Sequence, residues 1–134
     1  MTSIEDIVIE AVMDLINAMN NFKPIRRGAL GTGESLTCEL APSTVDAVFL
    51  DKNAVIILDL TLNGKHSDLQ ILSATMNNIV DHLTRMKTYP SGSGWEIVDI
   101  MHGAPPKPHV IGREEHNDWI MAGSVFIKFY RKDD

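Results

Sequence analysis

The spacing of apolar residues changes along the chain, and this change constrains the fold more than any other feature. Residues 54–62 read AVIILDLTL, an unbroken apolar run that turns into an alternation of leucines with Asp59 and Thr61. This pattern is typical of a strand covered on both faces at one end and half exposed at the other. Asn63-Gly64 would close the strand as a turn. For Asp59 we favour the outward orientation over a buried acid.

Two other segments carry apolar residues at three- and four-residue steps, which indicates amphipathic helices. The first covers residues 4–19 and the second covers residues 69–86. Ser3 and Ser67 are placed to cap these helices, each with a polar residue three positions further on, as in a capping box. The second helix is expected to end near Lys87.

Alternating or β-rich stretches predict further strands at residues 36–40, 45–50, 95–101 and 119–130. Pro42 would end the first of these, and residues 51–53 would form a turn. Residues 103–112 hold three prolines and should not form an interior strand. The last strand ends in FYRK, an amphipathic pattern that suits a sheet edge.

The helices do not alternate regularly with the strands, which favours an α+β fold. We expect a mixed or antiparallel sheet of about four strands flanked by two long helices. The 134 residues suit a single domain, 1–134, that buries roughly 65–70% of the surface of its unfolded chain.

Composition narrows the possible partners. Twelve basic and 18 acidic residues give a net charge of −6, which disfavours sequence-specific nucleic acid binding and attachment to an anionic membrane. The acidic N-terminus does not resemble a secretory signal, and the longest apolar run, residues 54–58, is too short to cross a membrane. We therefore expect a soluble, cytoplasmic protein.

No catalytic or metal-binding signature stands out, and we predict no catalytic residue, cofactor or metal. Cys38 is the sole cysteine and lies in an alternating apolar stretch, which suits an inert buried thiol. No two histidines are three or four residues apart, so we interpret them as scattered surface residues. A small enzyme that uses Asp59, His82 or Cys38 in a cleft remains the alternative from another functional class.

Residues 22–35 predict a flexible loop. GALGTGES at 28–35 looks like a glycine-rich phosphate loop, but Glu34 occupies the place of the Walker lysine and a strand, not a helix, follows. A carboxylate there would repel a phosphate.

Lys23, Arg26 and Arg27 are the basic cluster of the chain. They could contact a phosphate backbone, an acidic partner, or solvent alone. The first helix carries acidic residues that include Glu5 and Glu10, so a further reading is head-to-tail contact between subunits, which leads to rings or fibres. These five residues form our candidate subunit interface.

The C-terminal part resembles a known family. It contains Tyr89-Pro90, the strand WEIVDI at 95–100, a proline loop ending in VIG at 110–112, the polar turn REEHND at 113–118, and WIMAGSVFIKFYRK at 119–132. With the preceding helix, this order is similar to the minor capsid or tail terminator proteins of long-tailed bacteriophages and prophages. The resemblance covers about residues 54–132, and the first helix agrees in position and length alone.

The resemblance implies a structural virion protein with no enzymatic activity or cofactor. Such a subunit forms a ring, typically of six copies, that caps the tail tube and joins it to the head. It works in the cytoplasm of the host bacterium during assembly and then in the virion tail or neck. Its partners would be other copies of itself, the tail tube protein and head-connector proteins. A head-completion or connector adaptor, or a tail tube subunit, is the alternative. Relatives often have a shorter stretch before the first strand, so GALGTGES inherits no role.

Overall fold

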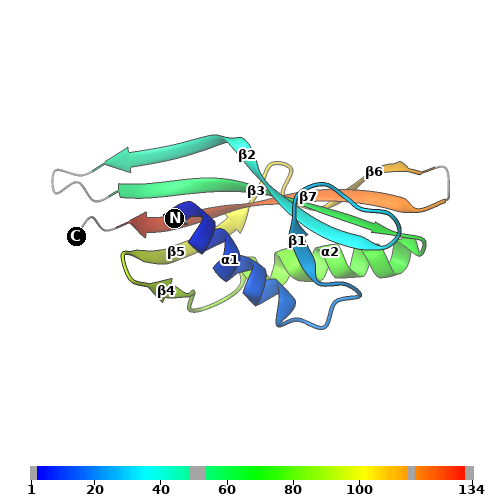
Figure 1. Cartoon of the computed structure of the whole chain (residues 1–134), viewed down its shortest axis with the longest axis horizontal. Helices are drawn as coiled ribbons and strands as arrows, with labels where there is room; N and C mark the ends of the chain where they lie inside the picture. Colours follow the sequence, from blue (N-terminus) through cyan, green and yellow to red (C-terminus); the bar gives the residue numbers. More distant parts are fainter. Residues whose placement is uncertain (1–2, 49–53, 115–116, 132–134) are drawn as a thin grey trace.

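The computed structural model describes residues 3–48, 54–114 and 117–131. Within these residues, two helices and seven strands form one unit (Figure 1). In chain order the elements are α1 (Ile4–Asn17), β1 (Ile25–Arg27), β2 (Ser35–Val48), β3 (Ala54–His66), α2 (Leu69–Thr84), β4 (Ser91–Gly92), β5 (Trp95–His102), β6 (His109–Arg113) and β7 (Trp119–Arg131).

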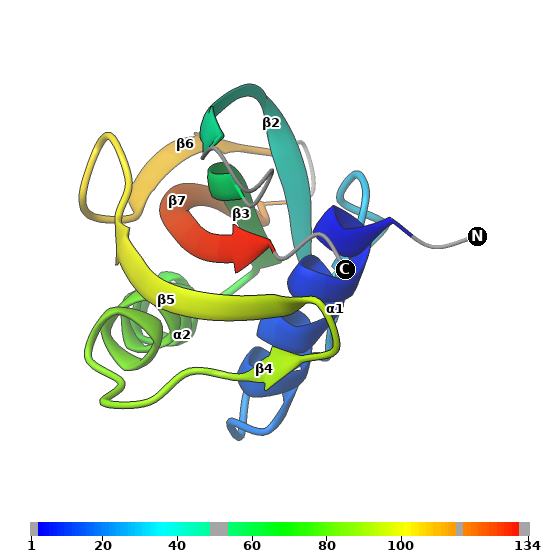
Figure 2. The ribbon, with the colours of Figure 1, turned by 90° about the vertical axis from the view of Figure 1, so that its left-hand side faces the viewer.

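The seven strands form a single mixed sheet in the order β1-β2-β3-β7-β5-β4, and β6 pairs with β7 outside this path. All pairs are antiparallel except β1–β2. The sheet is curled, with both helices on the same side of β3 and β7 (Figure 2). The expectation of about four strands flanked by two long helices is therefore wrong. It missed the short strands β1, β4 and β6, which lie in stretches rich in glycine and proline that carry no strand pattern.

Both predicted helices are confirmed. Ser3 caps α1 by accepting a hydrogen bond from the backbone N–H of Asp6 at 3.1 Å. The cap of α2 is Asp68, one residue later than predicted, and its carboxylate accepts from two backbone N–H groups of the first turn. No helix in the described ranges is long and apolar enough to cross a membrane.

The core lies between the helices and one face of the sheet. Alternate residues of β3 and β7 are buried there, against the apolar faces of α1 and α2. The largest fully buried side chains include Ile9, Ile16, Leu60, Leu72, Leu83 and Phe129.

Two predicted strand ends are wrong, each for its own reason. The first is Pro42, which lies inside β2, where the β2–β3 register shifts between Leu40 and Thr44. An irregular site on an outer strand tolerates a proline. The second is Gly64, which lies inside β3. A Cβ there would meet Leu72 Cδ1 at 2.7 Å, so this glycine allows α2 to approach the sheet.

Residues 22–35 are also more ordered than predicted, since they contain β1. This strand pairs with β2 in parallel, with Arg26 beside Thr37. Parallel strands usually need a connection of a dozen or more residues. Here residues 28–34 suffice, with Gly28 and Gly33 at positive φ values of 113° and 72°. Such angles favour glycine, which explains how so short a segment reverses twice.

The predicted edge strand at the C-terminus lies in the interior of the sheet, because β7 pairs with β3, β5 and β6. The proline loop behaves as expected, since β6 pairs with β7 alone. The predicted turn at residues 51–53 lies outside the described residues.

Candidate functional site

Two charges of the candidate subunit interface are paired within the chain. Arg27 Nη1 lies 2.7 Å from Asp6 Oδ1, and Arg131 Nη1 lies 3.7 Å from Glu5 Oε1. Arg27 lowers the pKa of Asp6, chiefly through this hydrogen bond. The basic cluster and the acidic helix α1 therefore lie side by side, rather than at opposite ends of the fold.

The other three residues of that interface are exposed. Lys23 and Arg26 flank the start of β1, and Glu10 lies on α1. None of the three makes an ion pair with any described residue. They remain the charges that are available for contact with another molecule.

A buried cation lies beneath the loop that joins β1 to β2. The Lys65 side chain is 3% exposed, and its ammonium donates to the carbonyl oxygen of Gly31 and to both carboxylate oxygens of Glu114 at 3.2 Å. Lys65 thus connects β3 to the glycine loop and to the turn between β6 and β7. Sequence analysis missed it, since a lysine between Gly64 and His66 gives no sign of burial.

His66 contradicts the expectation of surface histidines, because it is 7% exposed. Its Nδ1 accepts a hydrogen bond from the backbone N–H of Asp68 at 2.8 Å, which fixes the neutral tautomer with the proton on Nε2. That Nε2 lies 3.2 Å from Glu34 Oε1, and the ring packs edge-on against Phe22 with a centroid distance of 4.7 Å. The Glu34 carboxylate therefore lies beside His66, although its side chain is 45% exposed.

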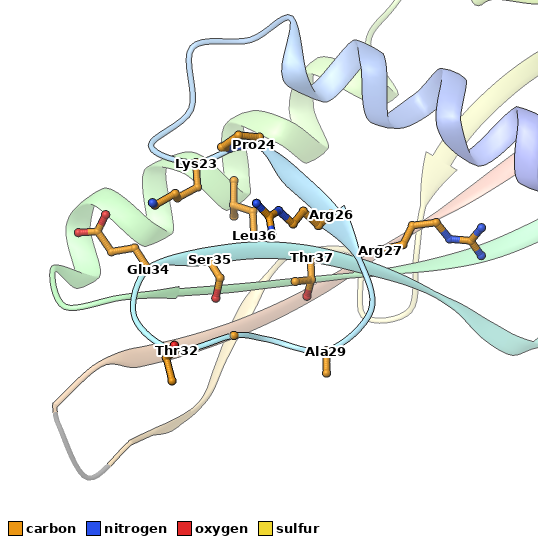
Figure 3. Close-up of a pocket in the computed structure, with 11 residues that line it drawn as sticks. Lys23, Pro24, Arg26, Arg27, Ala29, Thr32, Glu34, Ser35, Leu36 and Thr37 are labelled. Carbon is orange, nitrogen blue, oxygen red and sulfur yellow. The ribbon is translucent and has the colours of Figure 1, made fainter.

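β1, the glycine loop and the start of β2 enclose a hollow of about 660 Å³, which we call the glycine-loop cavity (Figure 3). Thr37 is 4% exposed and lines this cavity, and its hydroxyl finds no hydrogen-bond partner in the described part of the chain. The hydroxyl points from β2 toward the loop in Figure 3. Lys23, Arg26 and Glu34 also line the cavity.

The three residues of the enzyme alternative do not meet. Cys38 is fully buried in the core, and burial raises the pKa of its thiol to about 11. The prediction that this thiol is buried is confirmed, and its lack of reactivity stays a prediction. Asp59 lies between the buried Leu58 and Leu60, so it projects from the opposite face of the sheet, although its Oδ1 is itself buried and without a hydrogen-bond partner among the described residues. His82 is exposed on α2.

No three His, Cys, Asp or Glu side chains of the described ranges come together as metal ligands. In comparisons with known proteins, no family matches the chain, and no curated protein is significantly similar to it.

Proposed function

We propose that the chain is a structural subunit of a long-tailed bacteriophage or prophage, namely a tail terminator or minor capsid protein that forms a ring at the end of the tail tube and joins it to the head. The sequence pattern of residues 54–132 motivates the proposal.

The observation that carries the proposal is the edge of β2. This strand runs from Ser35 to Val48, but β1 pairs with residues 36–38 alone. From Glu39 onward, β2 has β3 as its sole strand neighbour among the described residues. A long edge with unpaired backbone groups can accept a strand or segment of another chain. Contact between this edge and a different surface of the next copy would be head-to-tail, which is the arrangement that closes into rings.

Two side chains make this edge testable. Leu40 is 37% exposed, immediately beyond the part of β2 that β1 covers. Val98 is 51% exposed on β5 and provides a matched apolar control elsewhere in the sheet. A lysine on an edge strand protects it from pairing. We therefore expect Leu40→Lys to prevent assembly and Val98→Lys to leave it intact.

The test is mass in solution, measured by light scattering after gel filtration over a tenfold concentration range. A ring of six would have about six times the subunit mass of 14.9 kDa, and Leu40→Lys would lower it to the mass of one subunit. Electron microscopy with added tail tubes covers assembly that needs a tube. A cap at the tube end indicates a terminator, whereas incorporation along the tube indicates a tail tube subunit. A chain that stays monomeric and ignores tail tubes contradicts the proposal.

Lys23 and Glu10 are two of the three charges of the candidate interface that are unpaired among the described residues, and they allow a separate test of head-to-tail contact. Lys23→Glu should weaken assembly, and Lys87→Glu, which makes the same charge change at another exposed lysine, should not. Adding Glu10→Lys to Lys23→Glu should restore assembly if these two side chains meet across subunits. If the two lysine variants behave alike, this charged contact is refuted.

A further inference from the structure

The glycine-loop cavity contains a buried polar group that the protein itself does not satisfy. Thr37 is 4% exposed, and its hydroxyl, which points toward the loop, has no partner among the described residues (Figure 3). Buried hydroxyl groups in proteins are nearly always hydrogen-bonded. A hydroxyl can donate as well as accept, so the missing partner can be an anion.

The positive charge around the cavity points to an anion. Arg26 is the register partner of Thr37 and lines the same cavity, as does Lys23. Neither cation makes an ion pair within the described part of the chain. The ammonium of Lys65 lies behind the loop, where it donates to the carbonyl of Gly31, but its charge is compensated by Glu114.

The acidic residues nearby are engaged elsewhere. Glu34, the residue that argues against a phosphate loop in the sequence, lies close to His66 Nε2 at 3.2 Å. In Figure 3 its carboxylate is turned away from the Thr37 hydroxyl. Glu114 contacts Lys65, and Asp6 pairs with Arg27. Among the described residues, no carboxylate therefore contacts Thr37 or Arg26 at the cavity wall.

The loop itself supplies backbone donors. The N–H of Gly28 donates to the carbonyl of Cys38, but the N–H groups of residues 29–34 donate no hydrogen bond within the described part of the chain. Successive free N–H groups in a glycine-rich turn form anion-binding concavities. A Cβ at Gly28, Gly31 or Gly33 would meet no atom within 4 Å, so the space beside this backbone is open.

We propose that the glycine-loop cavity binds a phosphate-type oxyanion, with Thr37 and Arg26 as its main side-chain ligands and the loop N–H groups as further donors. A threonine hydroxyl, a guanidinium and backbone N–H groups are all hydrogen-bond donors, which suits an oxyanion with several acceptor oxygens. The phosphate can belong to a small phosphate compound or to a nucleic acid backbone. The site does not depend on ring assembly, since all of its ligands come from one chain.

The test is a titration of ¹⁵N-labelled protein with inorganic phosphate, followed by amide chemical shifts. Sodium chloride at matched ionic strength controls for general screening. We expect saturable shifts confined to the amides of residues 28–37. Because hydrogen bonds to charged groups are strong, Thr37→Val and Arg26→Gln should each raise the apparent Kd for phosphate about tenfold or more.

Two matched variants keep the test specific. Thr61→Val makes the same change on neighbouring β3, outside the cavity, and Lys107→Gln removes one positive charge from an exposed loop. Both should bind phosphate as the unchanged protein does. The proposal is overturned if phosphate causes no saturable shift, or if Thr37→Val and Arg26→Gln bind as well as these controls.

A second arm identifies the source of the phosphate. A 12-base-pair DNA duplex is added to protein that is saturated with inorganic phosphate. Displacement of the phosphate, with loss of duplex binding in Thr37→Val, supports the site with a nucleic acid backbone as its source. A duplex that fails to compete supports the site as one for small phosphate compounds.

Discussion

The buried ammonium of Lys65 depends on Glu114 more than Glu114 depends on Lys65. The two side chains are 3% and 40% exposed, respectively, and lie 3.2 Å apart. Removing the charge of Glu114 leaves a cation that water does not reach, whereas removing Lys65 leaves a carboxylate that water can solvate. We therefore predict that Glu114→Gln destabilises the fold more than Lys65→Met, although Lys65 is the buried partner.

The magnitude follows from the same geometry. Two unit charges 3.2 Å apart attract by about 5 kcal/mol at an effective dielectric constant near 20. Exposed pairs contribute only about 0.2–1 kcal/mol, and Glu114 is partly exposed. The glutamine can still accept a hydrogen bond from Lys65. The expected value lies between the energy of an exposed pair and the full attraction of about 5 kcal/mol, so we expect Glu114→Gln to lower the free energy of unfolding by about 2 kcal/mol.

Lys65→Met should cost much less. Removing one partner of a buried ion pair is costly when the other charge stays buried, but Glu114 is 40% exposed and water can solvate it, while the cost of burying the Lys65 ammonium disappears. The Gly31 carbonyl loses its donor, which costs about 1 kcal/mol. We expect the free energy of unfolding to change by about 1 kcal/mol or less.

Urea unfolding and thermal melting measure both effects. At about 2.1 cal/mol/K of unfolding entropy per residue, 2 kcal/mol lowers the Tm of a chain of this size by about 7 °C. In the Lys65→Met background, Glu114→Gln should cost almost nothing, since its partner is gone. Glu10→Gln, on the exposed face of α1, is the control. The reasoning is refuted if Glu114→Gln costs the same in both backgrounds, or less than Lys65→Met.

Three further predictions follow from single contacts. Arg27→Gln should raise the pKa of Asp6 toward its ordinary value of 3.8, as measured by NMR titration. It should also remove the stabilisation that the ion pair gives the folded state. That stabilisation is complete above pH 3.8 and is lost as the pH falls through the lower pKa of Asp6 in the folded protein. A pKa of about 11 and full burial should protect Cys38 from a thiol reagent at pH 8 until urea unfolds the chain, and rapid labelling of the native protein would contradict this. Gly103→Ala should lower the free energy of unfolding, measured in urea, by at least about 1–3 kcal/mol, because the new Cβ would lie 2.6 Å from a backbone carbonyl oxygen of β7. Gly112→Ala is the control, because a Cβ there has open space around it and should not destabilise the fold. Equal stabilities of the two variants would refute the close approach at Gly103.

The helices were the most predictable part of the fold, because their signal is repeated over many residues. In α2, the apolar stripe predicted within residues 69–86 is buried at Leu72, Met76, Ile79, Val80 and Leu83. One residue that departs from the spacing does not obscure a pattern of this length. The end of a helix depends on one or two residues instead, and the prediction of Ser67 as the cap of α2 was accordingly wrong, since Asp68 is the cap.

The strands were less predictable, because a partner can override the local sequence. Pro42 and Gly64 look like strand ends in isolation, yet both lie inside strands. Pro42 coincides with a register shift on an outer strand, and Gly64 makes room for α2. β1 and β4 are three and two residues long, so they offer no period to detect.

The sequence shows the basic cluster as three charges within five residues, but it does not show which partner each charge contacts. Neighbouring residues of a strand project from opposite faces, so Arg26 and Arg27 are separated by the alternation of β1. Both arginines line the cavity, but Arg27 pairs with Asp6 on α1, while Arg26 lies beside Thr37. Predicting these different partners would require knowing that residues 25–27 form a strand. Three residues between a proline and a glycine are too few to show a strand pattern.

The same reasoning explains why the glycine loop was rejected as an anion site on sequence grounds. A phosphate-loop pattern assumes that each residue faces the ligand according to its place in the motif, so Glu34 counted against binding. In the folded chain, two elements outside the motif decide the orientation of these groups. The Glu34 carboxylate lies beside His66 at the end of β3, and β1 supplies Arg26 next to a threonine that no motif includes. An anion site of this kind is assembled by strand register and not by local spacing. It becomes recognisable once a buried hydroxyl lacks a partner.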